Sequence, residues 1–393
     1  MSEKKKFLYT STVSTAMQYS GILRKVAGQT AGMARLGWDA AYTCVEENCL
    51  LKRNGSTEQR YPFPACARWS DQQEQLAKKI GDILKEDPCD LIYIKGFLTN
   101  PYHAMIAKAA KAANPACKVV FEVATFPYWG EYKRFFRVDL KQKNLRSFLG
   151  HGREVAQHAF TTMTFSRYVD AVVTFGEQTD RLWRIPAMNV DNGVDVEAIP
   201  LREDRAPRDS VHLLGVVGTS VVHGYERVLD GMAAYKRQEG AMPVFFRVVG
   251  NNETIAALRD SAASLGLSDC VEFLGYKNAA ELAELYCESD VGISPLAEYK
   301  VGLNRLSPLK SREYLAAGLP LFFAYEDQYL TEDLPFVRIF PNDPSPIDIG
   351  EVVSFVLSCR ADPSLPQRER QFAKEHFDWE IIMKQILDFT GQA

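Results

Sequence analysis

A short segment that begins at Ser307 combines a predicted helix start with charged side chains at helical spacing. Ser307 is a favourable N-cap residue, and Pro308 suits the first position of a helix that Gly318 would end. The unpaired N–H groups of such a helix start attract phosphate, and Lys310 adds a positive charge beside them. Glu313 lies on the same face, where its carboxylate could accept hydrogen bonds from the two hydroxyls of a ribose. From this segment alone, phosphate binding and a capped surface helix with an i,i+3 ion pair are both open.

A second candidate anion site is the loop that follows a predicted strand at 212–217. Gly218 and Thr219 come directly after this strand, where a glycine lets a ligand approach the backbone closely. His223 and Arg227 are four residues apart and could share one face of the next helix. Taken singly, such a glycine is commonplace and such a histidine is more often structural. Two helix starts with nearby cations, both at the carboxyl ends of strands, suit a diphosphate better than a single phosphate.

Short apolar strands alternate with longer helical patterns along the chain, which indicates α/β layering with parallel sheets. In the second half, strands are predicted at 212–217, 244–249, 271–274, 291–294 and 319–324, and helices at 225–238, 254–265, 279–287 and 308–317. In the first half, strands are predicted at 7–9, 90–94, 118–123 and 171–175, and a helix at about 22–36. The predicted fold is α/β with two Rossmann-like, doubly wound domains, and the cleft between them is the expected ligand site.

The charged, proline-containing residues 201–210 are predicted to link the two domains. The N-terminal domain is then expected over 1–200 and the C-terminal domain over 211–370. A last amphipathic helix is predicted within 371–393.

The composition is that of a globular chain, with 46% hydrophobic and 24% charged residues. The formal net charge of -4 argues against a nucleic-acid binder that works through a general basic field. The 8 cysteines form no C-x-x-C pair and histidine is sparse, so neither a metal site nor a disulfide framework is expected. No apolar run approaches the ~18 residues of a membrane-spanning helix. We therefore expect a cytoplasmic protein without metal or cofactor.

Five short motifs occur in a fixed order over nearly the whole chain. They are FEVATFPY at 121–128, NGVD at 192–195, HGYER at 223–227, LKSREYLAAGLP at 309–320 and FDWE at 377–380. Each is loose by itself, but together they resemble bacterial family-4 glycosyltransferases of the GT-B fold, of the branch that builds capsular or exopolysaccharide. The resemblance implies transfer of a sugar from a nucleotide diphosphate-sugar to a glycan or lipid-linked acceptor, with retention and without a metal. It also implies that the last helix crosses back to the N-terminal domain.

Spacing and resemblance together define the candidate site residues. For the donor they are Gly218, Thr219, His223, Arg227, Tyr276, Ser307, Lys310 and Glu313, with Glu313 at the ribose and Tyr276 near the base. The acceptor candidate is Gly21, and the catalytic candidates are Glu122, Tyr128 and Arg305. In such enzymes the departing diphosphate helps to deprotonate the acceptor hydroxyl, so the protein mainly stabilises charge on that leaving group.

The sequence departs from the family pattern at two places. Arg305 stands where relatives commonly carry the first of two glutamates, and Pro127, with Tyr128 next, stands near the position of a frequent histidine. Two other functions therefore stay open. One is a nucleotide-sugar 2-epimerase of the same fold, although it would need acid and histidine groups that the first half hardly offers. The other is a GT-B subunit that scaffolds a partner transferase without catalysis.

Residues 131–153 form a basic stretch with interleaved apolar side chains. Its cations are Lys133, Arg134, Arg137, Lys141, Lys143, Arg146 and Arg153, against only two acidic residues. Such a segment could lie on an anionic membrane surface, beside a lipid-linked acceptor. It could equally be a solvated helix whose apolar residues face the domain core.

Overall fold

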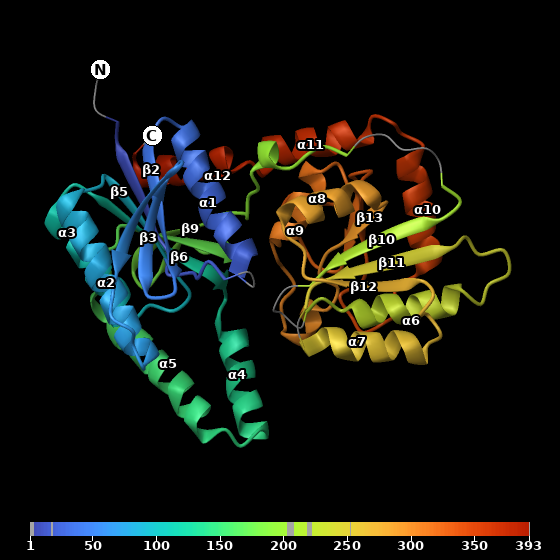
Figure 1. Ribbon diagram of the computed structural model, residues 1–393, viewed down its shortest axis with the longest axis horizontal. Coiled ribbons are helices and arrows are strands. Elements are labelled where there is room, and N and C mark those ends of the chain that lie inside the picture. The colour runs from blue at the N-terminus through green and yellow to red at the C-terminus, as the bar shows by residue number, and fades with distance from the viewer. Residues whose placement is uncertain (1–3, 17–18, 203–207, 218–221, 252, 393) are drawn as a thin grey trace. The chain divides into compact units, whose positions relative to one another are not determined.

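A computed structural model describes residues 4–16, 19–202, 208–217, 222–251 and 253–392 of the chain (Figure 1). The chain divides into two compact units. Unit 1 comprises Met1–Gly193 and Asp378–Ala393, and unit 2 comprises Val194–Phe377. Each unit is built on a sheet with parallel inner strands and helices on both faces, which confirms the predicted α/β class with two Rossmann-like units.

The unit boundaries differ from the predicted domain boundaries. Residues 194–200 belong to unit 2, whereas the prediction placed them in the N-terminal domain. Residues 371–377 also belong to unit 2, and the chain joins unit 1 again only from residue 378 onwards. Of the predicted linker, residues 203–207 lie outside the described residues.

Hydrogen bonds explain where unit 2 begins and ends. The N–H of Val194 donates to the carbonyl of Phe377 at 2.8 Å, so the first and last residues of the unit pair with each other. The guanidinium of Arg370 donates to the carbonyls of Ile199 and Val196 at 2.6 and 2.8 Å. Charged donors make strong hydrogen bonds, so they hold the segment after residue 193 against unit 2.

Among the described residues, unit 2 contains a six-stranded parallel sheet in the order β12-β11-β10-β13-β14-β15. Its strands are β10 (Val211–Val216), β11 (Val244–Val249), β12 (Val271–Gly275), β13 (Val291–Ile293), β14 (Leu321–Phe323) and β15 (Val337–Ile339). The first four agree with the predicted strands to within one residue at each end. The strand order reverses between β10 and β13, and open α/β sheets bind ligands at the carboxyl ends of the strands at such a point.

Helices cover both faces of this sheet. On one face, α6 (Tyr225–Tyr235), α7 (Glu253–Ser264) and α10 (Ile349–Arg360) share an apolar core with the strands. On the other face the helices are α8 (Ala279–Glu288), α9 (Leu309–Ala316) and α11 (Leu365–His376). Figure 1 shows α6 and α7 below the strands and α8 and α9 above them. Each buried aliphatic or aromatic side chain in these cores contributes about 1.5–3 kcal/mol.

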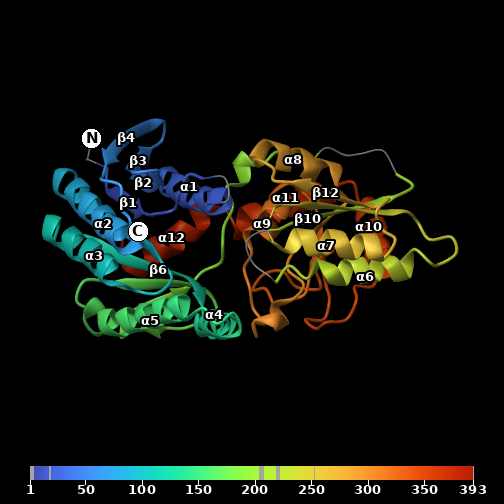
Figure 2. The ribbon, with the colours of Figure 1, turned by 60° about the horizontal axis from the view of Figure 1, so that its bottom comes forward.

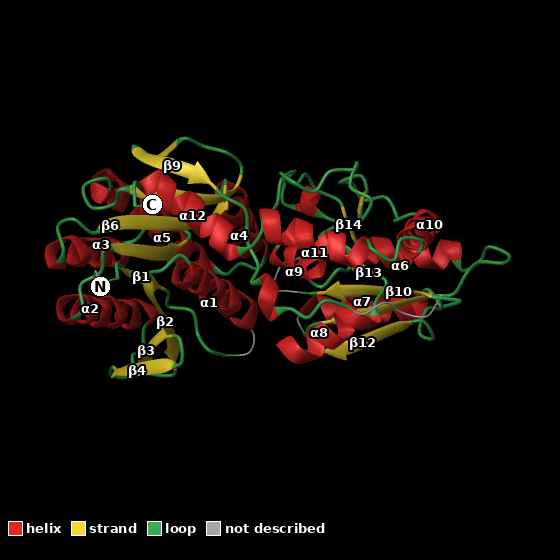
Figure 3. Cartoon of the chain, turned by 90° about the horizontal axis from the view of Figure 1, so that it is seen from above, coloured by secondary structure: helices red, strands yellow, loops and turns green. Residues whose placement is uncertain are grey.

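Unit 1 contains, within the described ranges, a nine-stranded sheet in the order β4-β3-β2-β1-β5-β6-β7-β9-β8. Its strands are β1 (Lys6–Thr10), β2 (Asp39–Glu46), β3 (Cys49–Asn54), β4 (Thr57–Pro62), β5 (Leu91–Gly96), β6 (Lys118–Phe126), β7 (Ala171–Gly176), β8 (Arg181–Leu182) and β9 (Ile185–Asn189). The six neighbouring strands β2, β1, β5, β6, β7 and β9 pair in parallel. The strand order reverses between β1 and β5. Figure 3 shows β4 and β9 at opposite ends of this sheet.

The antiparallel edge formed by β3 and β4 was not predicted. Its outer strand, β4, has the sequence TEQRYP and is almost entirely exposed, so it lacks the apolar alternation that reveals a half-buried strand. Backbone pairing holds it to the sheet, together with the ion pair of Glu58 with Arg53 and the packing of Tyr61 on the core.

The two faces of the unit 1 sheet carry different helices. An apolar core joins one face to α2 (Trp69–Glu86), α3 (Pro101–Ala113) and α5 (Leu145–Phe165). Helix α1 (Ser20–Arg35) packs beside α12 (Trp379–Thr390), as Figure 2 also shows. The ring of Trp379 is buried against Gly28, where any side-chain carbon would collide with it. Because successive residues of a strand face opposite sides, β6 turns Phe121 toward the apolar core and Glu122 toward α1.

The basic stretch forms α4 (Trp129–Lys141) and the start of α5, which pack together as a helical hairpin (Figure 1). Its aromatic residues face inward, with Phe135 stacked on His151 and Phe136 against Phe148 at centroid distances of 5.1 Å. Its aliphatic residues face outward, and Leu145 and Leu149 are 69% and 62% exposed. The inward aromatic residues agree with the interpretation of a helix that packs on its own domain, and the membrane contact stays a prediction.

Candidate functional site

The two predicted anion-binding segments of unit 2 meet at the carboxyl end of β10. Lys310, near the start of α9, donates to the carbonyl oxygen of Val216 at 2.6 Å. Its Nζ also lies 3.0 Å from Nδ1 of His223, although the two residues are 87 positions apart in the chain. The structure thus places Lys310 and His223 together at the point where the strand order of the sheet reverses.

Gly224 follows His223 directly and is the N-cap residue of α6. Gly224 has a φ of +66°, which L side chains rarely adopt, and a Cβ there would lie 2.8 Å from that of Ala297. The segment after β13 can therefore pack closely on the start of α6. Its backbone N–H groups at Leu296 and Ala297 donate to the carbonyls of His223 and Val222 at 3.1 and 3.0 Å.

The surroundings of Lys310 change its pKa. Burial lowers the pKa of Lys310 to about 7, although the nearby carboxylates of Glu313 and Glu298 oppose this shift. A lysine with this pKa is about half neutral at pH 7. A bound phosphate would favour the charged form, so the ammonium is stabilised most when an anion is present.

Glu313 lies on the same face of α9 as Lys310 and is partly exposed. The hydroxyl of Tyr286, on α8, donates to its Oε2 at 2.9 Å. The ring of Tyr286 is itself fixed edge-on against Tyr314 at a centroid distance of 5.5 Å. This hydrogen bond orients the carboxylate. The sequence offered no signal for Tyr286, because its role depends on α8 packing beside α9.

The opposite face of α9 is anchored in the core. The hydroxyl of Ser311 lies 2.6 Å from that of Ser294 and 2.8 Å from that of Tyr325. The buried guanidinium of Arg312 contacts the buried carboxylate of Asp327 at 2.6 Å. A helix held by such buried polar pairs can present its other face, with Lys310 and Glu313, in a fixed orientation. Asp327 was another contributor that the sequence did not reveal.

Two predictions about this region were wrong in detail. Pro308, with an extended backbone (φ -75°, ψ 137°), occupies the N-cap position of α9, so Ser307 lies one residue before it. Arg227 is only 2% exposed, and its Nε and Nη2 donate to the carbonyls of Ser345 and Pro341 at 2.6 and 3.0 Å. Its Nη1 donates to the carbonyl of Leu296. The Arg227 guanidinium therefore bonds to loop carbonyls inside the protein, and it is not available to a donor phosphate.

The remaining donor and catalytic candidates of unit 2 lie on the carboxyl side of the same sheet. Tyr276 directly follows β12 and is 36% exposed. Arg305 forms a backbone bridge with Glu326, and its Nη2 donates to Oε1 of Gln328 at 3.3 Å. The roles of Tyr276 and Arg305 stay predictions. The glycine-loop residues 218 and 219 lie outside the described residues.

A cavity of about 310 Å³ opens beside His223. It lies between the starts of α6 and α7, and its wall includes Thr254, Ser261 and the ion pair of Glu226 with Lys300. This volume is at the lower end of the range of small-molecule pockets. Unit 2 thus offers space for a ligand beside His223, the residue that Lys310 contacts.

In unit 1, the predicted catalytic residue Glu122 is fully buried. Lys95 and Lys25 lie 2.7 and 3.2 Å from its Oε1, and Tyr9 donates to its Oε2 at 3.0 Å. Burial by itself would raise the pKa of Glu122, but the two lysines outweigh it and lower the pKa to about 2. A sealed, fully paired carboxylate cannot act on a substrate, so its placement contradicts a direct catalytic role.

The predicted catalytic Tyr128 is also enclosed, at 4% exposure. Its hydroxyl lies 3.2 Å from Nε2 of His158 and accepts from Nε1 of Trp183 at 3.3 Å. This arrangement makes Tyr128 part of an aromatic cluster and not a surface group. By contrast Gly21, the acceptor candidate at the start of α1, is partly exposed, and a Cβ there would meet no atom within 4 Å.

Over the described ranges of the chain, no group of three or more His, Cys, Asp or Glu side chains is arranged to hold a metal ion. No helix there is both long enough and apolar enough to cross a membrane.

The two Rossmann-like units define a protein of the GT-B class, and comparison with solved structures agrees. Sucrose-phosphate synthase (tll1590) from Thermosynechococcus elongatus has a TM-score of 0.63 at 14% identity, over 99% of both chains. Anabaena Alr3699/HepE in complex with UDP-glucose has a TM-score of 0.57 at 16% identity, over 99% of this chain and 100% of that one. These similarities establish the fold.

Sequence comparisons add a family assignment for unit 2. Residues 211–324 match the family "Glycosyl transferases group 1". The amylovoran biosynthesis glycosyltransferase AmsK from Erwinia amylovora is 24% identical over 129 residues, which are 33% of this chain. The match spans about a third (31%) of the length of AmsK. These findings show that part of the chain is similar to glycosyltransferases, in agreement with the resemblance that the motifs indicated.

Proposed function

We propose that the chain transfers a sugar from a nucleotide diphosphate-sugar to a glycan or lipid-linked acceptor, with retention, in the synthesis of a cell-surface polysaccharide. The observation that carries this proposal is the convergence of Lys310, His223 and Glu313 at the reversal point of the unit 2 sheet. Two similar proteins add support, because HepE has been solved with UDP-glucose and AmsK takes part in amylovoran biosynthesis.

In this proposal the start of α9 and Lys310 bind the donor diphosphate, with His223 beside them. Glu313, oriented by Tyr286, accepts hydrogen bonds from the ribose hydroxyls. When the bond between the sugar and the diphosphate breaks, negative charge grows on the leaving group. Lys310 and the helix N–H groups are already in place to stabilise that charge, and the diphosphate takes the proton of the acceptor hydroxyl.

The test is a nucleotide-release assay on single variants. Lys310→Ala should lower turnover by roughly 10²-fold, as expected when one preorganised charge donor is lost. Glu313→Ala should chiefly weaken donor binding. Lys236→Ala is a matched control, because Lys236 lies at the C-terminal end of α6, away from His223, in an exposed pair with Asp269. If Lys310→Ala turns over like Lys236→Ala, the proposed donor site is wrong.

The same protein distinguishes the two alternatives. With donor and no acceptor, a transferase gives only slow hydrolysis, whereas an epimerase converts the sugar of the donor. A scaffold subunit releases no nucleotide with any acceptor.

A thermal-shift screen identifies the nucleotide. UDP, GDP and CDP should stabilise the chain unequally, and about 2.7 kcal/mol is expected at 100 times the Kd. No shift with any nucleotide would contradict the donor site directly.

The outward face of α5 supports the finer proposal of a membrane contact. Leu145, Leu149, Phe160 and Met163 are 69%, 62%, 75% and 73% exposed. Their spacing places them on one face of the helix, whereas a helix on a protein surface normally turns that face inward. The exposed cations beside this stripe are Lys141, Lys143, Arg146 and Arg153. Two copies of this face would repel each other, but anionic lipid would attract it. We therefore propose that the enzyme works on the cytoplasmic face of an anionic membrane.

Co-sedimentation with vesicles tests the membrane contact. The chain should bind vesicles that contain phosphatidylglycerol at low salt and release them at high salt, because the cations are exposed and screened. Leu145→Ser with Leu149→Ser should weaken the binding. Leu357→Ser is the matched control, since Leu357 is 42% exposed on α10 of unit 2. Equal binding by all three proteins, or none by the wild type, would rule out this contact.

A further inference from the structure

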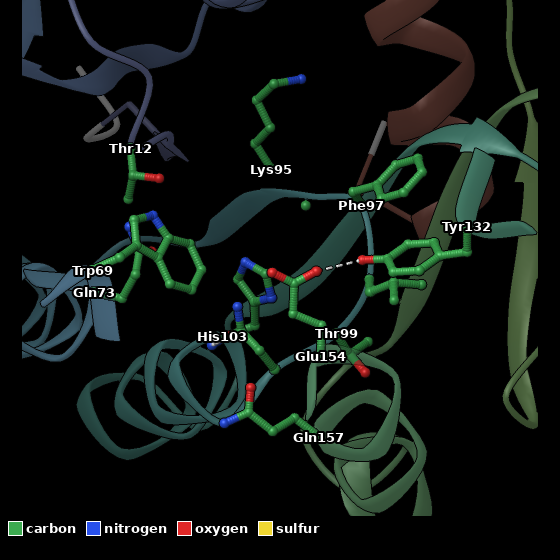
Figure 4. Close-up of a pocket in the computed structure, with 13 residues that line it drawn as sticks. Thr12, Trp69, Gln73, Lys95, Phe97, Thr99, His103, Tyr132, Glu154 and Gln157 are labelled. Atoms are coloured by element: carbon green, nitrogen blue, oxygen red, sulfur yellow. Dashed lines mark hydrogen bonds between the residues drawn. The ribbon is translucent and has the colours of Figure 1, made fainter. Parts of the chain in front are cut away.

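A second cavity, in unit 1, opens at the carboxyl ends of β1 and β5 and has a volume of about 280 Å³ (Figure 4). The strand order of this sheet reverses between the same two strands. Open α/β sheets bind ligands at such a point, so the cavity occupies in unit 1 the place that the Lys310 cluster occupies in unit 2. No residue that the sequence singled out lines it. The lining side chains that matter here are Trp69, Gln73, Lys95, His103, Glu154 and Gln157.

An aromatic side chain forms part of the wall. Trp69 is the first residue of α2, and 59% of its surface is exposed. Ligand pockets combine such aromatic surface with a few placed polar groups. The apolar faces of a pyranose ring, which carry its C–H bonds, are suited to stack on an indole. A large aromatic residue at the cavity therefore favours a ligand with a flat apolar face.

The polar groups of the cavity can serve hydroxyl groups. The side-chain amides of Gln73 and Gln157 have no hydrogen-bond partner within the described part of the chain, and an amide both donates and accepts. The carboxylate of Glu154 accepts a hydrogen bond from the hydroxyl of Tyr132 at 2.9 Å, which orients it (Figure 4). The buried Nδ1 of His103 likewise lacks a partner among the described residues. Sugar hydroxyls, which donate and accept, would satisfy the two amides and Glu154, whereas Nδ1 of His103 is too deeply buried to meet a ligand.

The charges of the cavity disfavour a phosphate. Lys95 is the one lysine among the described lining residues, and its Nζ lies 2.7 Å from the buried carboxylate of Glu122, which offsets part of its charge. Burial lowers the pKa of His103 to about 4, so the ring is neutral at pH 7. Glu154 would repel an anion. The chemistry of the lining thus fits a neutral, polyhydroxylated ligand.

We propose that this cavity binds one neutral pyranose ring of the acceptor, with Trp69 stacked on the ring and Gln73, Gln157 and Glu154 on its hydroxyls. The proposal rests on the proposed function for its identification of the ligand as an acceptor. The binding itself requires only the geometry of unit 1.

Saturation-transfer NMR on the full chain with a panel of methyl pyranosides tests the binding. At least one should bind, and Trp69→Ala should raise its Kd by about tenfold or more, the scale of a lost aromatic anchor. Because Trp69 is exposed, this variant should keep the wild-type melting temperature. Trp129→Ala is the matched control, since Trp129 is 46% exposed at the start of α4 and does not line the cavity. Gln73→Ala with Gln157→Ala should also weaken the binding.

Three results would overturn the proposal. No pyranoside binds the wild type, or Trp69→Ala binds like Trp129→Ala, or inorganic diphosphate displaces the bound sugar, which would make the cavity an anion site. UDP, GDP and CDP thermal shifts on the same samples keep the two proposals separate. If a nucleotide binds and turnover occurs while the sugar results fail, only the acceptor cavity is wrong. If the sugar binds and no nucleotide does, the donor site is wrong and the cavity remains.

Discussion

Both units of this chain reverse their strand order near the middle of a sheet whose inner strands are parallel, but the chemistry at the two reversal points differs. In unit 2 the cation Lys310 lies at the carboxyl edge and is only partly buried, with a pKa near 7. In unit 1 the buried Glu122 pairs with both Lys25 and Lys95, and amide and aromatic groups line the cavity together with Glu154. The same position in the same kind of sheet can thus suit an anion in one unit and a neutral sugar in the other.

The difference also shows how burial separates structural charges from binding charges. Glu122 and Arg227 both stand in recognisable motifs, yet both are saturated by partners inside the protein. Lys310 and Glu313 stand in a motif as well, but they are partly exposed. Substitution of Glu122 or Arg227 should therefore lower the stability of the fold, whereas substitution of Lys310 or Glu313 should weaken ligand binding.

The largest effect should come from the buried cluster of unit 1. Glu122→Ala leaves Lys25 and Lys95 without their counter-charge, and breaking such a buried pair costs about 3–5 kcal/mol. Denaturant unfolding followed by circular dichroism measures this loss. Glu313→Ala, removing a partly exposed carboxylate, should lose much less stability. If the two variants lose the same free energy of unfolding, Glu122 is no more structural than Glu313.

A somewhat smaller loss of stability is expected for Arg227→Ala. The substitution leaves the carbonyls of Ser345, Leu296 and Pro341 without their donor, and we expect a loss of about 3 kcal/mol. The protein that remains folded should bind nucleotide with nearly wild-type affinity, which calorimetry can measure. A large loss of nucleotide affinity without a loss of stability would show that Arg227 binds the donor after all.

The affinity of unit 2 for a nucleotide diphosphate-sugar should depend on pH. In the protein without ligand the pKa of Lys310 is about 7, and a bound diphosphate raises this pKa. Above pH 7, Lys310 therefore takes up a proton when the ligand binds. The Kd should be constant below pH 7 and rise by up to about tenfold per unit above it. Lys310→Arg keeps its charge throughout this range, so its Kd should not change with pH. A wild-type profile as flat as that of the arginine variant would contradict the assigned pKa.

The smallest effect should come from Gly21→Ala. The site has room for a methyl group, and replacing a helical glycine by alanine should change stability by no more than about 1 kcal/mol, in the favourable direction. If Gly21 lies at the acceptor, the KM for the acceptor should rise while donor binding is unchanged. An unchanged KM would exclude Gly21 from the acceptor site.

The sequence predicted the regular elements of unit 2 better than those of unit 1. The strand at 244–249 was predicted with its observed bounds, because a buried parallel strand is a nearly continuous apolar run. The polar edge strand β4 was missed, because its side chains are mostly exposed and lack an apolar alternation. The start of α9 was one residue off, since Pro308 adopts an extended backbone outside the helix.

The candidate site divides in the same way. His223, Lys310 and Glu313 could be proposed from helix starts and spacing, because those signals are local. Tyr286, Asp327 and Trp69 could not, because each matters through an element that is distant in the sequence.

By itself, the sequence determined the α/β class, the presence of two Rossmann-like units and the cationic helix start of unit 2. These features follow from the periodicity of apolar residues and from the turn and capping preferences of neighbouring residues, which act over short distances. Only the tertiary structure decided which charges are available to a ligand. Whether Glu122, Arg227 or Lys310 is sealed depends on which remote side chains surround it, and residues as far apart as Lys310 and His223 meet only when the sheet has formed.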